Sequence, residues 1–96
     1  MGSNQPDFEL GCASEEAQRQ CEEIDGPQFW RILRMLRKNP FPGVGRNIRP
    51  IPGPIDNAFF AWDENAGLVC RVAYLVMVPH NVVITAASLK QLPPYL

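Results

Sequence analysis

A segment rich in proline and glycine divides the chain into two parts of different character. Residues 39–57 hold five prolines and three glycines. Proline lacks a backbone N–H and glycine weakens regular structure, so neither a helix nor a central strand persists through such a segment. We therefore predict a long connecting loop, and a loop of this length in a small domain usually carries function or packs across a surface.

Before the loop, the sequence predicts a short strand and two helices. Residues 7–12 alternate polar and apolar side chains, which indicates a strand. Ser14 is followed by two glutamates, which is typical of a helix N-cap. A second helix begins at Pro27, which suits a first helical position, and ends at Asn39, before Pro40. Its apolar residues share one helical face, which we expect to be buried: Phe29, Ile32, Leu33 and Leu36.

After the loop, the sequence predicts an antiparallel meander. Three segments are rich in β-branched and aromatic residues, namely 58–63, 68–78 and 82–87. The segments between them, 64–67 and 79–81, have the composition of turns. These patterns predict three consecutive strands joined by tight connections.

The predicted fold class is therefore α+β, with an N-terminal strand, a helical hairpin and a three-stranded antiparallel meander in the order β-α-α-β-β-β. We expect both helices on one face of the sheet. The middle strand is apolar apart from Arg71, so we expect it to be central and covered at least in part on both faces.

The 96 residues fit a single domain, 1–96, with irregular or flexible tails at 1–6 and 91–96. The segment 88–96 is expected to be irregular. Because a domain this small buries little surface, a partner or a second copy would stabilise it.

Charge is distributed unevenly along the chain, although the net charge is only −1. Residues 1–30 hold seven acidic residues and one arginine, whereas residues 31–49 hold six basic residues and no acidic one. The candidate nucleic-acid or partner-binding residues are these six: Arg31, Arg34, Arg37, Lys38, Arg46 and Arg49. They favour binding to phosphates or to an acidic protein surface. The alternative is a solvated helix face whose charges pair with the acidic first helix.

The cysteines do not indicate a metal site. Cys12, Cys21 and Cys70 lack the paired spacing of zinc ligands, and the single histidine, His80, falls in a predicted turn. We expect the three thiols to be reduced and buried, and we expect no metal and no cofactor.

No segment suggests a membrane location. The longest apolar run, 72–78, is far shorter than the roughly 20 residues of a membrane-spanning helix. The N-terminal residues lack the basic and apolar regions of a secretory signal. We therefore expect a cytoplasmic protein without a membrane partner.

The order of these segments carries a family resemblance. The second helix ends in Leu36-Arg37-Lys38-Asn39-Pro40, and the middle strand reads Cys70-Arg71-Val72-Ala73-Tyr74-Leu75-Val76. From Phe8 to about Lys90 the sequence resembles the RelE/ParE superfamily of toxins from bacterial type II toxin-antitoxin systems. In that family a short strand and a helical hairpin lead to a loop and a meander whose central strand often reads Tyr-Arg-Val-Ile-Tyr.

The resemblance implies one of two activities. Members similar to RelE cleave messenger RNA on the ribosome with basic and aromatic side chains on the concave sheet surface. Members similar to ParE inhibit DNA gyrase without nuclease chemistry. Both kinds are neutralised by a cognate antitoxin that wraps around the toxin, so the implied partners are an antitoxin and either the ribosome with its mRNA or gyrase. A small α+β protein-interaction domain without toxicity is the alternative outside the family.

For RNA cleavage, the resemblance implies two catalytic candidates. Arg71 matches the central-strand arginine that faces the scissile phosphate, and a guanidinium donates several hydrogen bonds to phosphate oxygens. Lys90 is what remains of a basic pair at the end of the last strand. The alternative for Arg71 is a charged residue that pairs with an acidic residue or reaches the edge of the sheet. Strand alternation places Tyr74 on the opposite face, in the core.

The catalytic set implied by the family is incomplete in this chain. Residues 59–62 carry aromatic residues where RNA-cleaving members often carry lysine or arginine. His80 is expected to be a solvated turn residue rather than a general base. Tyr95 follows two prolines and is expected to be packed or frayed. Trp30 is expected in the core rather than as a platform for base stacking.

Overall fold

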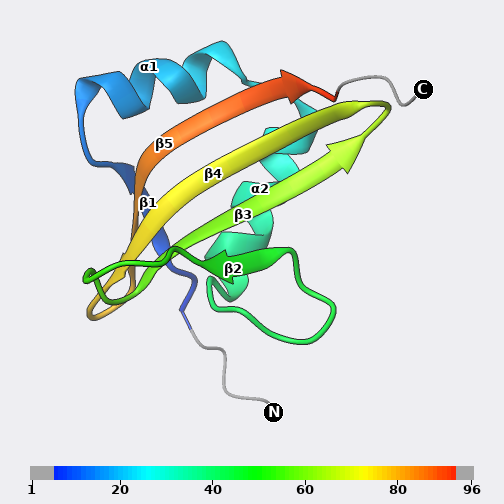
Figure 1. Cartoon of the computed structure of the whole chain (residues 1–96). Helices are drawn as coiled ribbons and strands as arrows, with labels where there is room; N and C mark the ends of the chain where they lie inside the picture. Colours follow the sequence, from blue (N-terminus) through cyan, green and yellow to red (C-terminus); the bar gives the residue numbers. More distant parts are fainter. Residues whose placement is uncertain (1–5, 93–96) are drawn as a thin grey trace.

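Two helices cover one face of a five-stranded mixed sheet in this protein, whose computed structural model describes residues 6–92 (Figure 1). The elements follow the chain as β1 (Glu9–Cys12), α1 (Glu15–Glu23), α2 (Pro27–Lys38), β2 (Ile48–Pro50), β3 (Ala58–Asn65), β4 (Leu68–Met77) and β5 (Asn81–Gln91). The strand order is β1-β5-β4-β3-β2. β1 runs parallel to β5, and all other neighbours are antiparallel. The predicted α+β class is confirmed.

Both helices form where their end signals predict. The Ser14 side chain accepts a hydrogen bond of 3.1 Å from the Ala17 N–H and caps α1. Pro27 occupies the start of α2, and Asn39 is its C-cap. The predicted apolar face of α2 is buried, with Phe29, Ile32, Leu33 and Leu36 all in the hydrophobic core. This face attaches α2 to the sheet.

The connecting loop differs from the prediction because it contains a fifth strand, β2. Ile48 is fully buried and pairs with Ala61 of β3. Pro50 is tolerated because β2 is an edge strand, where a missing N–H costs no sheet hydrogen bond. The Tyr74 hydroxyl donates a 2.7 Å hydrogen bond to the Pro40 carbonyl and holds the start of this loop against the sheet.

The meander is confirmed, but its last strand is longer than predicted. β3 and β4 are joined by Ala66 and Gly67, whose φ angles of 53° and 79° are those of a type I′ hairpin turn. β5 continues to Gln91, so the prediction that residues 88–91 are irregular was wrong. These residues pair with residues 68–71 of β4, and backbone pairing compensates for their weak strand composition.

The terminal segments expected at 1–6 and 91–96 fall mostly outside the described residues. Pro6, Gln91 and Leu92 are described, whereas residues 1–5 and 93–96, Tyr95 among them, are not.

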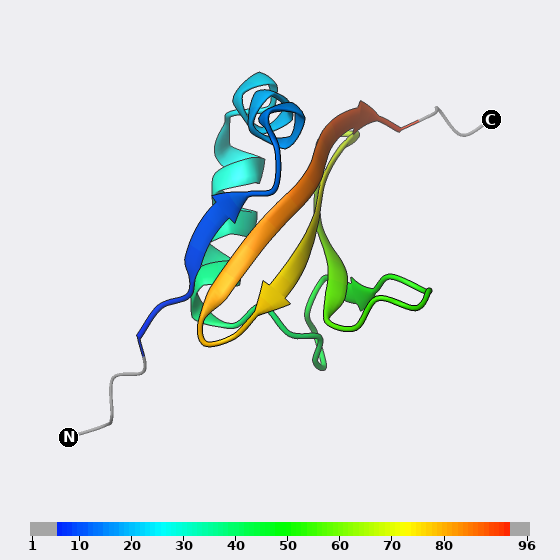
Figure 2. The same cartoon turned by 90° about the vertical axis from the view of Figure 1, so that its left-hand side faces the viewer.

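The helices leave the other face of the sheet uncovered. Both helices lie on one side, and the segment that follows β2 projects on the opposite side (Figure 2). β4 is central, as predicted, and its cover on this second face is only partial: Val69, Ala73 and Leu75 are half-buried. Tyr74 and Val72 face the helices and are fully buried, as strand alternation predicts. No helix within residues 6–92 is long and apolar enough to cross a membrane.

Two predictions about burial were wrong. Cys21 and Cys70 are buried as expected, but Cys12 is exposed at the end of β1. Trp30 is 52 % exposed because it lies one residue, or about 100° of helical rotation, beyond the buried Phe29.

Candidate functional site

The uncovered side of the sheet, here named the open face, carries the side chains best suited to binding or catalysis. Around Arg71, cross-strand pairing arranges the side chains of this face in three rows. The first row is Arg49, Phe60, Ala73 and Ala86, the second is Trp62, Arg71 and Ser88, and the third is Glu64, Val69 and Lys90. The open face therefore combines aromatic residues with three basic residues and one acidic residue.

Arg71 lies at the centre of the open face, on the central strand β4. Its direct cross-strand neighbours are Trp62 on β3 and Ser88 on β5. Its guanidinium lies over the Phe60 ring, 4.6 Å from the ring centroid, and the residue is exposed. Within residues 6–92 Arg71 forms no ion pair, so the alternative of an acid-paired arginine is not what the structure shows. Stacking holds the guanidinium in place while its N–H edges stay available to an anion.

A second arginine stacks beside it. The Arg49 guanidinium lies 5.7 Å from the centroid of the Trp62 ring. The Phe60 and Trp62 rings are themselves 5.6 Å apart with an interplanar angle of 37°. Two neighbouring aromatic side chains, Trp62 and Phe60, therefore position Arg49 and Arg71.

Two hollows on the open face share Phe60 and Arg71 in their linings, and the two together are here called the groove. The larger, about 510 Å³, extends toward Ile51, Pro52 and Ser88 and is also lined by Gln20 of α1. The smaller, about 420 Å³, extends toward Trp62, Glu64 and Arg49. A groove of this size accepts a ligand as large as a nucleotide unit.

Glu64 and Lys90 flank Arg71 diagonally. Glu64 is two residues beyond Trp62 on β3, and Lys90 is two residues beyond Ser88 on β5. Such diagonal neighbours lie on the order of 7 Å apart. Both residues are exposed, and Glu64 lines the same hollow as Arg71. Sequence reasoning named Lys90 but missed Glu64, although its alternation with Phe60 and Trp62 was a usable signal.

A bulge in β5 is what brings Lys90 to this face. The register shifts beside Ala73, which pairs with Ala86, while Tyr74 pairs with Ile84. The extra residue, Thr85, reverses the alternation of the side chains that follow it. Without the bulge, Lys90 would face the helices.

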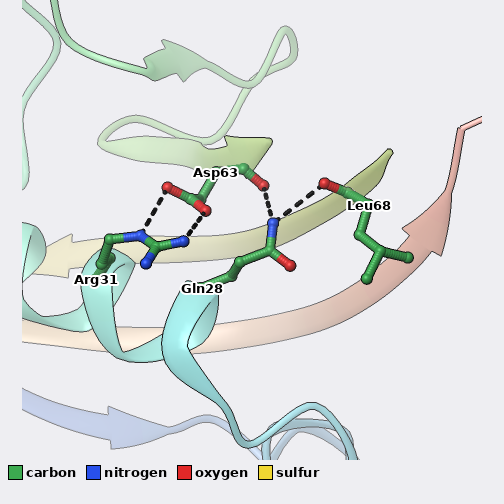
Figure 3. Close-up of polar contacts among 4 residues, drawn as sticks. All are labelled: Gln28, Arg31, Asp63 and Leu68. Carbon is green, nitrogen blue, oxygen red and sulfur yellow. Dashed lines mark hydrogen bonds and ion pairs between the residues drawn. The ribbon is translucent and has the colours of Figure 1, made fainter. Parts of the chain in front are cut away.

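Arg31 does not reach the open face because it is bound on the helix side. Its Nε and Nη2 atoms donate to Asp63 Oδ1 at 3.3 Å and to Asp63 Oδ2 at 3.0 Å (Figure 3). The hydrogen bonds from Arg31 hold the pKa of the Asp63 carboxyl below its usual range. Gln28 donates to the backbone carbonyls of Asp63 and Leu68 at 3.0 and 3.1 Å, so this cluster ties α2 to the β3–β4 hairpin.

The other basic candidates lie apart from one another and do not form a single binding surface. Lys38 pairs with Asp7 at 3.1 Å, and the Arg46 guanidinium donates to the carbonyls of Asn39 and Phe41. No ion pair in the described part of the chain joins any of them to α1, so these residues do not show the alternative of pairing with the acidic first helix. Of the six residues, only Arg49 lies on the open face.

The remaining ionisable side chains are unsuited to chemistry on the open face. His80 is exposed in the β4–β5 turn, as predicted, and its ring lies 4.8 Å from that of Phe8. Burial raises the pKa of the Cys21 thiol to about 12 and that of the Cys70 thiol to about 11. Burial also raises the pKa of the Tyr74 hydroxyl. Between residues 6 and 92, no three His, Cys, Asp or Glu side chains gather in a way that could hold a metal ion.

Comparisons with protein-family models, with curated proteins and with solved structures find no match for this chain.

Proposed function

We propose that the protein is a toxin of a type II toxin-antitoxin system, similar to RelE, and that the open face binds and cleaves messenger RNA on the ribosome. The observation that carries the proposal is that Arg71 and Glu64 line one aromatic hollow, with Lys90 paired to Val69 at its margin. The resemblance of the sequence to the RelE/ParE superfamily supports it, as does the agreement in the order of strand, helical hairpin and meander. A cognate antitoxin is the implied neutralising partner.

RNA binding follows from the composition of the groove. Arg49, Arg71 and Lys90 can each neutralise a backbone phosphate, and each such contact releases counterions. Phe60 and Trp62 are half-buried, so part of each ring remains available to a nucleobase. Three basic residues against one acidic residue give this face a positive character that suits single-stranded RNA.

Cleavage requires a proton acceptor, a stabiliser of the phosphate and a proton donor. The Glu64 carboxylate is positioned to accept the proton of a ribose 2′-hydroxyl, whose oxygen then attacks the adjacent phosphorus. Arg71 stabilises the charge that develops on the phosphate oxygens. The Lys90 ammonium donates a proton to the departing 5′-oxygen as the P–O5′ bond breaks. The products are a 2′,3′-cyclic phosphate and a free 5′-hydroxyl.

The first experiment is induced expression in a bacterial host, with growth and transcript integrity as readouts. We expect growth arrest that the neighbouring open reading frame relieves, and primer extension should map cuts within translated codons. Intact transcripts together with DNA damage would instead indicate gyrase inhibition and would overturn the nuclease proposal. Normal growth at full expression would overturn toxicity altogether and favour a protein-interaction domain.

Single substitutions then test the assigned roles. Glu64→Gln removes the proton acceptor while keeping the shape of the side chain, and we expect cleavage about 10²–10⁴-fold slower. Glu9→Gln is the matched control, because Glu9 is an exposed glutamate on the edge strand β1. Cleavage by Glu64→Gln at the rate of the Glu9→Gln control would remove Glu64 from the mechanism.

A further inference from the structure

One side of α2 exposes a tryptophan and two arginines that no other described element covers. Trp30, Arg34 and Arg37 follow a spacing of i, i+4 and i+7, which places them on one helical face beside the buried Leu33. They line a shallow hollow of about 230 Å³. Trp30 is 52 % exposed, and neither Arg34 nor Arg37 forms an ion pair within residues 6–92. An exposed tryptophan beside two free arginines is typical of a protein interface.

The neighbouring helix has the opposite charge. α1 carries four glutamates, namely Glu15, Glu16, Glu22 and Glu23, against one arginine. Its single ion pair among the described residues is internal, between Arg19 and Glu16. The other three glutamates are exposed, and none of them forms an ion pair with a basic side chain of α2. Each chain thus presents an acidic helix and a basic helix that do not neutralise each other.

We infer that the two helices form a homodimer interface, in which α1 of each copy docks on the Trp30–Arg37 stripe of the other. A two-fold arrangement makes this contact twice, because the same patch of each copy supplies both an acidic and a basic surface. A nucleic acid on this side would satisfy Arg34 and Arg37 but would be repelled by the glutamates of α1. A second copy satisfies both sets of charges at once.

A dimer formed through the helices is compatible with ligand binding on the open face. Figure 2 shows both helices on the side of the sheet opposite the segment that follows β2. α1 borders the larger hollow through Gln20, whereas the hollow lined by Trp62 and Glu64 has no helix residue in its lining and would stay accessible in each docked copy. The dimer would also add buried surface to a domain whose small size limits its own core. The inference stands independently of the function proposed for the groove.

Sedimentation equilibrium of the full chain tests the dimer. We expect a reversible monomer–dimer equilibrium whose dissociation constant rises about tenfold or more between about 50 mM and about 1 M NaCl, because high salt screens the charge pairs. Trp30→Ala should shift the protein to monomer, whereas Arg71→Ala should leave the equilibrium unchanged. A wild-type protein that stays monomeric at high concentration in low salt, or a dimer that Trp30→Ala does not weaken, would overturn the inference.

A charge swap makes the test independent of folding defects. Arg34→Glu/Arg37→Glu and Glu22→Lys/Glu23→Lys should each be monomeric alone, because each faces like charges across the two-fold axis. Mixed together they should form a heterodimer, since both contacts then pair opposite charges. As a control for general attraction, Glu9→Lys/Asp56→Lys carries the same added charge away from α1 and should not rescue the Arg34→Glu/Arg37→Glu variant. Failure of the intended pair to associate, or equal rescue by the control, would contradict the interface.

Discussion

The hydrogen bond from Tyr74 to Pro40 provides a quantitative test of how the loop is held on the sheet. Tyr74 is fully buried on β4, and its hydroxyl donates to the Pro40 carbonyl at 2.7 Å. Tyr74→Phe keeps the ring, whose centroid lies 5.9 Å from that of the Phe59 ring, and removes only the hydroxyl that donates the hydrogen bond. The buried carbonyl is then unsatisfied, which costs about 1–3 kcal/mol. We expect a loss near the middle of this range, about 1.5 kcal/mol.

Chemical and thermal unfolding measure this loss. For a domain of this size, about 1.5 kcal/mol corresponds to a fall in Tm of roughly 6–12 °C. The slope of the free energy of unfolding against urea should not change, because the surface exposed on unfolding is the same. Ser88→Ala is the control, since it also deletes a hydroxyl, but one that forms no hydrogen bond within residues 6–92. A Tyr74→Phe protein as stable as the control would refute the role assigned to this bond.

Two further predictions concern ionisable groups away from the groove. Arg31 lowers the folded-state pKa of Asp63, so the ion pair stabilises the protein above the unfolded-state pKa of about 3.9 and this contribution is lost as the pH falls below it. Asp63→Asn should therefore lower the urea midpoint at pH 7 but not at low pH, and an equal deficit at both pH values would exclude the ion pair as its cause. A thiol reagent at pH 8 should modify the exposed Cys12 rapidly and the buried Cys21 and Cys70 only after denaturation, because burial raises the pKa of both. Rapid reaction of more than one thiol in the folded protein would contradict the assigned burial.

Periodicity and end signals identified the parts of the fold that are determined locally. The apolar face of α2 follows from side chains three and four residues apart. The placement of Arg71 opposite Tyr74 follows from alternation along a single strand. In both cases the information lies within one element, so no knowledge of the partner elements was needed.

The features that the sequence did not reveal depend on pairing between distant segments. β2 is only three residues long, and it exists because Ile48 is buried against Ala61 of β3. The extension of β5 beyond residue 87 is polar apart from Leu89, and it forms a strand through pairing with β4. Strand register decides that Glu64 and Lys90 lie in the row next to Arg71, and the bulge at Thr85, which simple alternation does not reveal, decides that Lys90 is on the open face.

The central claim is that the open face, with Arg71 at its centre, is the surface through which the protein arrests growth. The most direct measurement compares growth on induced expression of Arg71→Ala with that of Arg19→Ala, a control at an exposed arginine on α1, after circular dichroism and unfolding show both to be folded and equally abundant. Our account predicts that cells expressing Arg71→Ala divide normally while cells expressing Arg19→Ala stop. Growth arrest by a folded Arg71→Ala protein would contradict it.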